Sequence, residues 1–262
     1  MSDLQTIRTA LERCYDSIEG LCASLDDAEW ATQSLCPDWT VRGVVSHLAG
    51  VEEVLSGWLP DGVETPPPFE RAGAFARETS DLDNSAFAAR VGEVFSVRRR
   101  DLAGLSEGDL ERPSWMPTGP GVYGRFLSIR VFDFWVHERD ITTPLGRGTD
   151  DTGLCAEIAL GEVAGSLGYI VGKKVGFPDG RGITFRLTGP VERDLSVVVD
   201  GRAKIVEHIE KPDVELVTDS VTFVQLACGR IDPQGPIDAG TVSWTGDAEL
   251  GELAARNLRY TM

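Results

Sequence analysis

The spacing of the apolar residues changes near residue 145, and this change constrains the fold more than any other feature of the chain. Before that point, apolar residues recur at intervals of three, four and seven, which places them on one face of a helix. These intervals predict four helices, over residues 3–26, within 36–59, and over 82–105 and 122–141. The stretches between them that are rich in proline or glycine are predicted to be loops. Four helices with long and short connections are typical of a helical bundle.

After residue 151 the pattern becomes mixed. A helix is predicted over 152–172, and apolar and polar residues then alternate, as they do in half-buried strands. The alternating segments are residues 182–187, 195–200, 203–208, 214–219 and 240–246, and helical spacing returns at 220–230 and 247–258. We therefore predict an α + α+β protein: a helical bundle over 1–147, followed by a smaller α+β domain over 148–262 with an antiparallel sheet.

Charge and composition exclude several classes of partner. The formal net charge is −17, whereas nucleic acids and anionic membranes are bound mainly by basic surfaces. We find no apolar run of the about 20 residues that a membrane span needs, and the first residues, MSDLQTIRTALERCYD, lack the basic start of a secretory signal. We expect a cytoplasmic protein with no nucleic acid or membrane partner.

Cysteine usage agrees with a reducing compartment. The five cysteines are odd in number, are scattered and form no C-x-x-C pair. Reduced thiols with structural roles are the simplest interpretation.

One helix combines apolar residues with groups that can do chemistry. In RVFDFWVHERD, residues 130–140, Asp133 and His137 are four apart and share a helix face, with Arg130 one turn earlier. His47 flanks the apolar stripe of the second predicted helix. An antiparallel bundle can bring these two imidazoles and one carboxylate together, a donor set that suits Zn²⁺ or another divalent ion with one position open.

Two plainer interpretations fit the same spacing. Asp133 and His137 also match a helix ion pair worth about 0.2–0.5 kcal/mol, and a histidine beside an apolar stripe is often a hydrogen-bonded core residue. If a metal does bind, Asp140, three residues after His137, can accept the other ring N–H. His208, the third histidine, is predicted to lie on the surface.

Two motifs resemble a known family. Trp39 to Leu48 is similar to the W-(S/T)-x₆-H-(L/I) helix of DinB-like four-helix bundles, and R-x-x-D-x-x-x-H-x-x-D, from Arg130 to Asp140, resembles the fourth-helix motif of one branch. That branch is the mycothiol-dependent maleylpyruvate isomerase family, in which the bundle precedes a sterol-carrier-like α+β domain. Residues 221–258 are similar to the end of that domain, so the resemblance spans most of the chain.

The resemblance implies a set of site residues. The metal ligands of the family fall on His47, Asp133 and His137, although the isomerase of the family has Glu where this chain has Asp133. Arg130 is expected to contact the cofactor. The family also uses an arginine of the C-terminal domain in catalysis, for which Arg230 is the best match. Competing positions for this role are Arg193 and Arg202, and a solvated arginine at a helix end is the plain alternative for Arg230.

The resemblance also implies the chemistry. A divalent metal, expected to be Zn²⁺, would activate the low-molecular-weight thiol mycothiol for addition to a small electrophile, in an isomerase or an S-transferase. Two other functions stay open: a non-catalytic small-molecule or lipid-binding protein with a structural or vestigial metal site, and a metal-dependent hydrolase. In each case a monomer or homodimer is expected.

Overall fold

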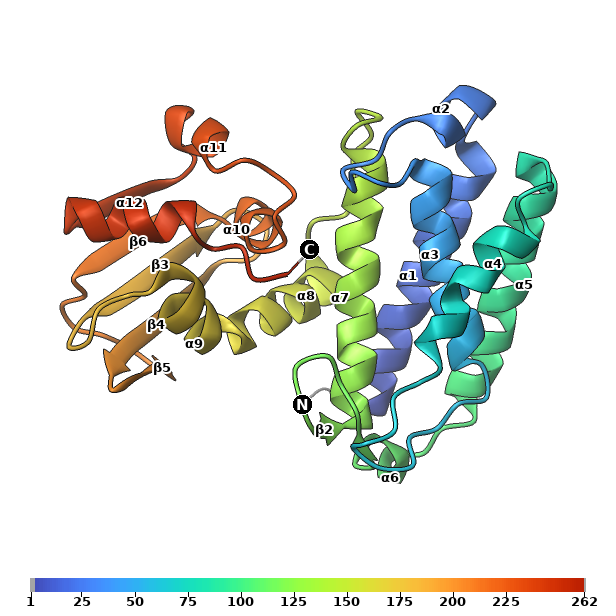
Figure 1. Ribbon diagram of the computed structural model, residues 1–262, viewed down its shortest axis with the longest axis horizontal. Helices are drawn as coiled ribbons and strands as arrows, with labels where there is room; N and C mark the ends of the chain where they lie inside the picture. Colours follow the sequence, from blue (N-terminus) through green and yellow to red (C-terminus); the bar gives the residue numbers. More distant parts are fainter. Residues whose placement is uncertain (1–2, 262) are drawn as a thin grey trace. The chain divides into compact units, whose positions relative to one another are not determined.

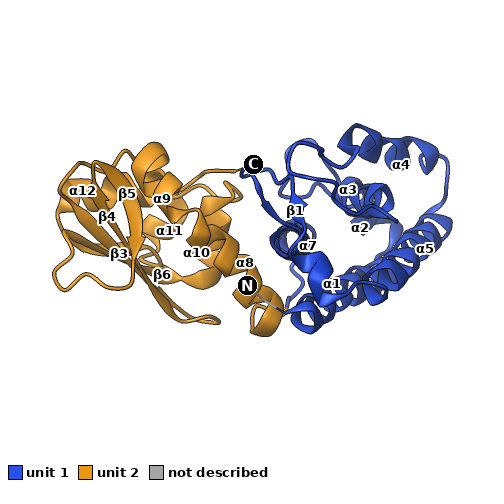
Figure 2. Ribbon diagram, turned by 90° about the horizontal axis from the view of Figure 1, so that it is seen from below, with its two compact units in different colours: residues 1–149 blue, residues 150–262 orange. Residues whose placement is uncertain are grey.

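The computed structural model describes residues 3–261, which form two compact units, Met1–Thr149 and Asp150–Met262 (Figure 2). Each unit has its own core. Unit 1 consists mainly of helices, and all strands of the large sheet belong to unit 2. This division follows the change in apolar spacing near residue 145.

Unit 1 is a four-helix bundle (Figure 1). Its long helices are α1 (Leu4–Ser24), α3 (Val41–Leu55), α5 (Asn84–Ala103) and α7 (Tyr123–Thr142). Helix α1 packs on α5 and α7, and α3 packs on the same two helices, so the four enclose one core. The four predicted helices are confirmed, with ends shifted by a few residues.

Side-chain caps explain where three of these helices begin. Asp3, Thr40 and Asp83 each accept a hydrogen bond from the backbone N–H three residues later, which satisfies a donor that the first helical turn leaves open. Thr40 thereby starts α3 after Pro37, which places His47 two turns into the helix.

Short elements connect the long helices. They are α2 (Asp27–Ala31), the 3₁₀ turn η1 (Phe69–Arg71), α4 (Ala72–Glu78), α6 (Glu107–Leu110) and the two-stranded ribbon of β1 (Pro113–Ser114) and β2 (Gly121–Val122). One of the proline-rich stretches between the predicted helices is residues 60–73, and the prediction of a loop there is wrong at its end, where η1 and α4 begin. The reason is tertiary: Phe75 of α4 is buried against α3.

The close packing of α4 on α3 depends on Gly50. A Cβ atom at this position would lie 2.4 Å from the carbonyl oxygen of Ala72 and 3.1 Å from Cβ of Phe75. We expect Gly50→Ala to lower the free energy of unfolding of unit 1 by about 1–3 kcal/mol through overpacking, measured by chemical denaturation. The matched control is Gly20→Ala, because Gly20 is an exposed helical glycine with open space around its Cβ position, and it should gain about 0.5–1 kcal/mol. Equal stability of the two variants would contradict this account.

Unit 2 is α+β. A helical run, formed by α8 (Gly153–Gly165), α9 (Leu167–Tyr169) and the π-helical η2 (Ile170–Val175), precedes a five-stranded sheet in the order β5-β4-β3-β6-β7. The strands are β3 (Gly182–Thr188), β4 (Arg193–Asp200), β5 (Arg202–Val206), β6 (Val214–Asp219) and β7 (Ser243–Gly246). Helices α10 (Ser220–Ala227) and α12 (Ala248–Arg256) pack on β6, and the short α11 (Gln234–Asp238) lies between them in the chain.

The predicted antiparallel sheet needs one correction. Three of its neighbouring pairs are antiparallel, but β3 and β6 are parallel, with Phe185 opposite Leu216. The sheet is therefore mixed. Alternation of apolar and polar residues shows which faces of a strand are buried, but it carries no information about the direction of the neighbouring strand.

The expectation that no stretch could span a membrane is also wrong for one segment. Residues Gly153–Val175 are long and apolar enough by length and composition. In the structure, however, Leu160, Val163 and Leu167 of this run are buried inside unit 2, and the run packs on α10 and β5. These contacts place one side of the run in the core of unit 2.

Candidate metal centre

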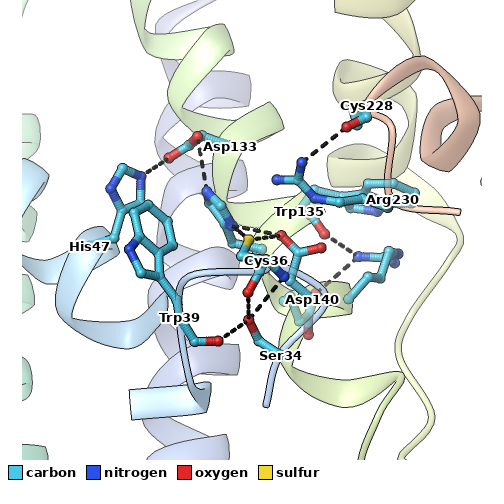
Figure 3. A network of polar contacts seen from close by, with 12 residues as sticks. Ser34, Cys36, Trp39, His47, Asp133, Trp135, Asp140, Cys228 and Arg230 are labelled. Carbon is cyan, nitrogen blue, oxygen red and sulfur yellow. Dashed lines mark hydrogen bonds and ion pairs between the residues drawn. The ribbon is translucent and has the colours of Figure 1, made fainter. Parts of the chain in front are cut away.

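Two helices of the bundle bring together the three predicted metal-binding residues. His47 lies on α3, and Asp133 and His137 lie on α7, which packs on α3. Nε2 of His47 is 3.4 Å from Oδ2 of Asp133, and Nε2 of His137 is 3.6 Å from Oδ1 of the same carboxylate (Figure 3). One donor atom from each residue lies within 4.8 Å of the others, a spacing at which a single ion can contact all three.

A second carboxylate orients His137. Nδ1 of His137 lies 2.8 Å from Oδ2 of Asp140, and Asp140 is completely buried. An ionised Asp140 can only accept a hydrogen bond, which would place the proton of His137 on Nδ1. In the neutral ring this leaves the lone pair on Nε2, the nitrogen that faces Asp133. The pairing is the one found around metal-binding histidines, where an outer carboxylate fixes the tautomer.

Trp39 orients the other imidazole. Its ring stacks on that of His47 with 4.9 Å between the centroids and an angle of 26° between the planes. The side chain of His47 is 28% exposed, whereas that of His137 is 7% exposed. The candidate centre is therefore open on the side of His47 and closed on the side of His137.

Asp133 is held in its ionised form. Partial burial would by itself raise the pKa of its carboxyl group. The positive charge of Arg130, whose Nη1 donates to Oδ2 of Asp133 at 2.7 Å, acts in the opposite direction together with both imidazoles. The net result is a pKa well below the usual range. Asp133 thus offers a negatively charged oxygen at neutral pH.

Arg130 is buried and faces two carboxylates. Its Nε donates to Oε1 of Glu52 at 2.9 Å, and its Nη1 donates to Asp133. Glu52 in turn accepts from Nε of Arg98 and from the hydroxyl of Tyr15, both at 2.8 Å. Sequence reasoning missed Glu52 and Arg98. A direct contact between Arg130 and a cofactor stays a prediction.

Cys36 is another residue of this site that sequence reasoning missed. Its Sγ lies 3.2 Å from Oδ2 of Asp140 and 3.8 Å from Nδ1 of His137. The loop before α3 holds it there, since Ser34 accepts from the Cys36 backbone N–H and the Leu35 N–H donates to the carbonyl of Asp140. The sequence gives no signal for this, because Cys36 belongs to no helical repeat. Its closeness to the outer carboxylate of His137 makes it part of the support of the site.

The arginine expected in catalysis lies in unit 2. Arg230 follows α10, and its Nη1 donates to the carbonyl of Cys228 at 3.0 Å (Figure 3). Of its competitors, Arg193 forms an ion pair with Glu157 on the surface of unit 2, and Arg202 is exposed on β5. The catalytic role of Arg230 stays a prediction.

The donor set fits a divalent metal ion. Two imidazoles and one carboxylate are the protein ligands of many catalytic zinc centres, which keep a further position for water or substrate. Here one imidazole has its second nitrogen bonded to a carboxylate, and the shared carboxylate is ionised. These features make the arrangement more than an isolated helix ion pair.

The depressed pKa of Asp133 gives a pH prediction. A group whose folded pKa lies below its unfolded value of about 3.9 contributes stability that is present above that value. The contribution is lost as the pH falls through the folded pKa. For metal-free protein, we expect the thermal midpoint of unit 1 to fall steeply below about pH 4, and to fall less in Asp133→Asn. Parallel pH profiles of the two proteins, measured by circular dichroism, would contradict the assignment.

Comparisons with known proteins agree with this architecture. Residues 11–142 match the family model of the mycothiol maleylpyruvate isomerase N-terminal domain, and residues 157–253 match that of the C-terminal domain of the same family. An uncharacterized protein of Mycobacterium tuberculosis, Rv0738, is 24% identical over 155 residues, which cover 59% of this chain and 74% of that protein.

Two solved structures share the fold. The crystal structure of a histidine-to-alanine mutant of the mycothiol-dependent maleylpyruvate isomerase superposes with a TM-score of 0.62 at 19% identity, covering 95% of this chain and 98% of that chain. A second crystal structure of the mycothiol-dependent maleylpyruvate isomerase gives a TM-score of 0.59 at 18% identity, covering 88% and 93%. With family models matched in both halves and this shared fold, the chain belongs to the mycothiol-dependent maleylpyruvate isomerase family.

Proposed function

We propose that this chain is a metal-dependent enzyme that activates a low-molecular-weight thiol, mycothiol, for addition to a small electrophile. The observation that carries the proposal is the convergence of His47, Asp133 and His137, with Nε2 of His137 directed to the shared carboxylate by its bond to Asp140. Zn²⁺ is the ion that we expect, because it is commonly held by imidazole and carboxylate.

The ion and the side chains have separate tasks in this proposal. The contribution of a bound divalent cation would be to stabilise the thiolate form of a thiol whose free pKa is about 8.5. His47, Asp133 and His137 would hold the cation. Asp140 keeps the proton of His137 on Nδ1, and Trp39 keeps the ring of His47 in place. The half-exposed side of His47 is where a thiol can enter.

The shorter carboxylate of this chain supports the same role. Asp133 stands where the isomerase of the family has Glu, and aspartate is one methylene shorter. Asp133 nevertheless lies within 3.4–3.6 Å of an Nε2 atom of each histidine. This closeness to both imidazoles supports the proposal that the shorter side chain of Asp133 can reach the same ion.

The reaction is expected to begin with formation of a sulfur–carbon bond. The thiol sulfur adds to an electrophilic double bond, and the neighbouring carbon gains the proton. In an isomerase, the former double bond rotates and the thiol is then eliminated, so that the thiol is regenerated. In an S-transferase the adduct is released as the product. An arginine, for which Arg230 is our candidate, would hold a substrate carboxylate by a bidentate pair.

A binding protein is the second candidate, and one observation favours it. Unit 2 contains a pocket of about 280 Å³ lined by apolar residues, two arginines and one aspartate, among them Leu226, Ile231, Asp232, Arg256 and Arg259. This volume would accept a small ligand. In that case the protein would retain such a ligand on purification and carry no metal.

The decisive experiment begins with the protein purified without chelator or histidine tag. We expect about one zinc or similar ion per chain by elemental mass spectrometry, and turnover of maleylpyruvate or another cis-enedione only when mycothiol is added. Metal without any thiol-dependent turnover, but with hydrolysis of an ester or amide, would replace the proposal by a hydrolase. Absence of metal together with a co-purified acyl ligand would favour the binding protein. We also expect a cytoplasmic location, in agreement with the scattered cysteines, and no nucleic acid partner, because the net charge is −17.

A further inference from the structure

In the interior of the bundle, four charged side chains form one connected row, and Arg98 at one end of it also bonds to the partly exposed Asp101. They come from three helices: Glu52 from α3, Arg98 from α5, and Arg130 and Asp133 from α7. Glu52, Arg98 and Arg130 are buried, and the side chain of Asp133, at the end of the row, is 26% exposed. The row therefore runs from the closed interior to the candidate metal centre.

Glu52 is the central member, and both of its oxygens are occupied. Oε1 accepts from Nε of Arg130, and Oε2 accepts from Nε of Arg98 and from the Tyr15 hydroxyl. Burial would raise the pKa of Glu52, but the two guanidinium groups outweigh burial and lower it. Glu52 is thus a fixed negative charge in the middle of the bundle.

Arg130 couples the position of Asp133 to that of Glu52, because it is hydrogen-bonded to both. A guanidinium group is planar and rigid, so a hydrogen bond at one edge restricts the direction of the others. Nε of Arg130 is bound to Glu52, and Nη1 donates to Oδ2 of Asp133 at 2.7 Å. Any displacement of Glu52 would therefore move the group that holds Asp133.

The two oxygens of Asp133 differ as a result. Oδ2 accepts the hydrogen bond from Arg130 and lies 3.4 Å from Nε2 of His47. Oδ1 accepts no hydrogen bond from any residue within 3–261, and it lies 3.6 Å from Nε2 of His137. The hydrogen bond from Arg130 thus holds the carboxylate in an orientation in which each oxygen faces one imidazole.

We propose that Glu52 is a positioning residue of the metal centre: acting through Arg130, it holds the carboxylate of Asp133 in the orientation that faces both imidazoles. This inference rests on the proposed metal-dependent function and assigns a role to a residue that contacts neither metal nor substrate. A role limited to holding α3, α5 and α7 together would predict effects on stability alone.

The test uses the full chain, prepared metal-free and titrated with Co²⁺ and Zn²⁺ in competition with a chelator. We expect Glu52→Gln to weaken binding about 10–100-fold, the effect typical of residues that support metal ligands, and to change the visible absorption spectrum of bound Co²⁺. The first control is Glu53→Gln, since Glu53 is the neighbouring residue on α3 and pairs with Arg90 at the surface. It should bind both ions as the wild type does.

A second control separates positioning from general loosening. Phe87→Leu removes a buried ring of α5 that packs against Trp30 and Phe75, so it destabilises the bundle away from the four charged residues and from Tyr15. We expect it to keep the wild-type Co²⁺ spectrum and affinity. If Glu52→Gln does not fold, Glu52→Asp is measured in its place, because it retains the charge but shortens the reach to Arg130.

The outcomes are distinguishable. Wild-type affinity and spectrum in a folded Glu52 variant would overturn this inference and leave the proposed function intact. An equal loss of affinity in Phe87→Leu would also overturn it, since the effect would then follow stability. A wild-type protein that binds neither ion would overturn both the inference and the proposed function.

Discussion

Replacing His137 by alanine is expected to abolish stoichiometric metal binding. His137 supplies one of three donors, and it is the donor whose lone pair is directed by a buried carboxylate. Loss of an outer partner of a ligand usually costs about 10–100-fold in metal affinity, so loss of the ligand itself should cost more than about 100-fold. The measurement is metal content after purification, followed by chelator competition.

The chain provides a matched control for this experiment. His208 is the third histidine, and it is exposed in unit 2. His208→Ala should keep the metal content of the wild type. Retention of the metal by His137→Ala, with an unchanged affinity, would show that the ion binds elsewhere and would remove the basis of the proposed function.

Replacing Phe134 by alanine is expected to produce the largest loss of stability. Phe134 lies on α7 next to Asp133, is 1% exposed, and meets the rings of Tyr15 and Phe95 at centroid distances of 5.3 and 5.8 Å. Removing a buried phenyl group usually costs about 3–5 kcal/mol. At about 2–4 °C per kcal/mol for a domain of this size, the thermal midpoint of unit 1 should fall by roughly 6–20 °C.

The readout for Phe134→Ala is thermal and urea unfolding followed by circular dichroism. Leu82→Ala is the comparison, because Leu82 is an apolar residue of unit 1 that is 37% exposed, and it should change stability by less than about 0.5 kcal/mol. A loss below about 1 kcal/mol in Phe134→Ala would mean that the aromatic cluster is not the core of the bundle.

The long helices could be predicted because their periodic apolar residues are the ones that they bury. Leu48 and Val51 on α3 and Val131 and Phe134 on α7 are core residues. Asp133 and His137 share a face because they are four residues apart. His47 approaches Asp133 and His137 because α3 packs on α7. The sequence suggests this packing only through the expectation of a bundle and through the family resemblance.

The sequence does not predict which charged side chains are buried, because the same residue types also occur on the surface. Glu52 and Glu53 are neighbours in VEEVL, yet Glu52 is completely buried and the side chain of Glu53 is 34% exposed. In VRRRD, Arg98 is buried while the next residue, Arg99, pairs with Glu19 near the surface. Only the assembled bundle shows which member of each run points inward.

The charge balance of the bundle interior has a consequence for how the protein would acquire its ion. Glu52 and Asp133 carry two negative charges, Arg98 and Arg130 carry two positive ones, and direct hydrogen bonds link them into one row. Each of these four groups therefore already has an oppositely charged partner in the folded bundle before an ion binds. In zinc fingers, by contrast, the ion is needed for the chain to fold at all. Here the ion can enter a finished protein from the side of His47, and a chelator should yield a folded apoprotein that can be reloaded with a different metal.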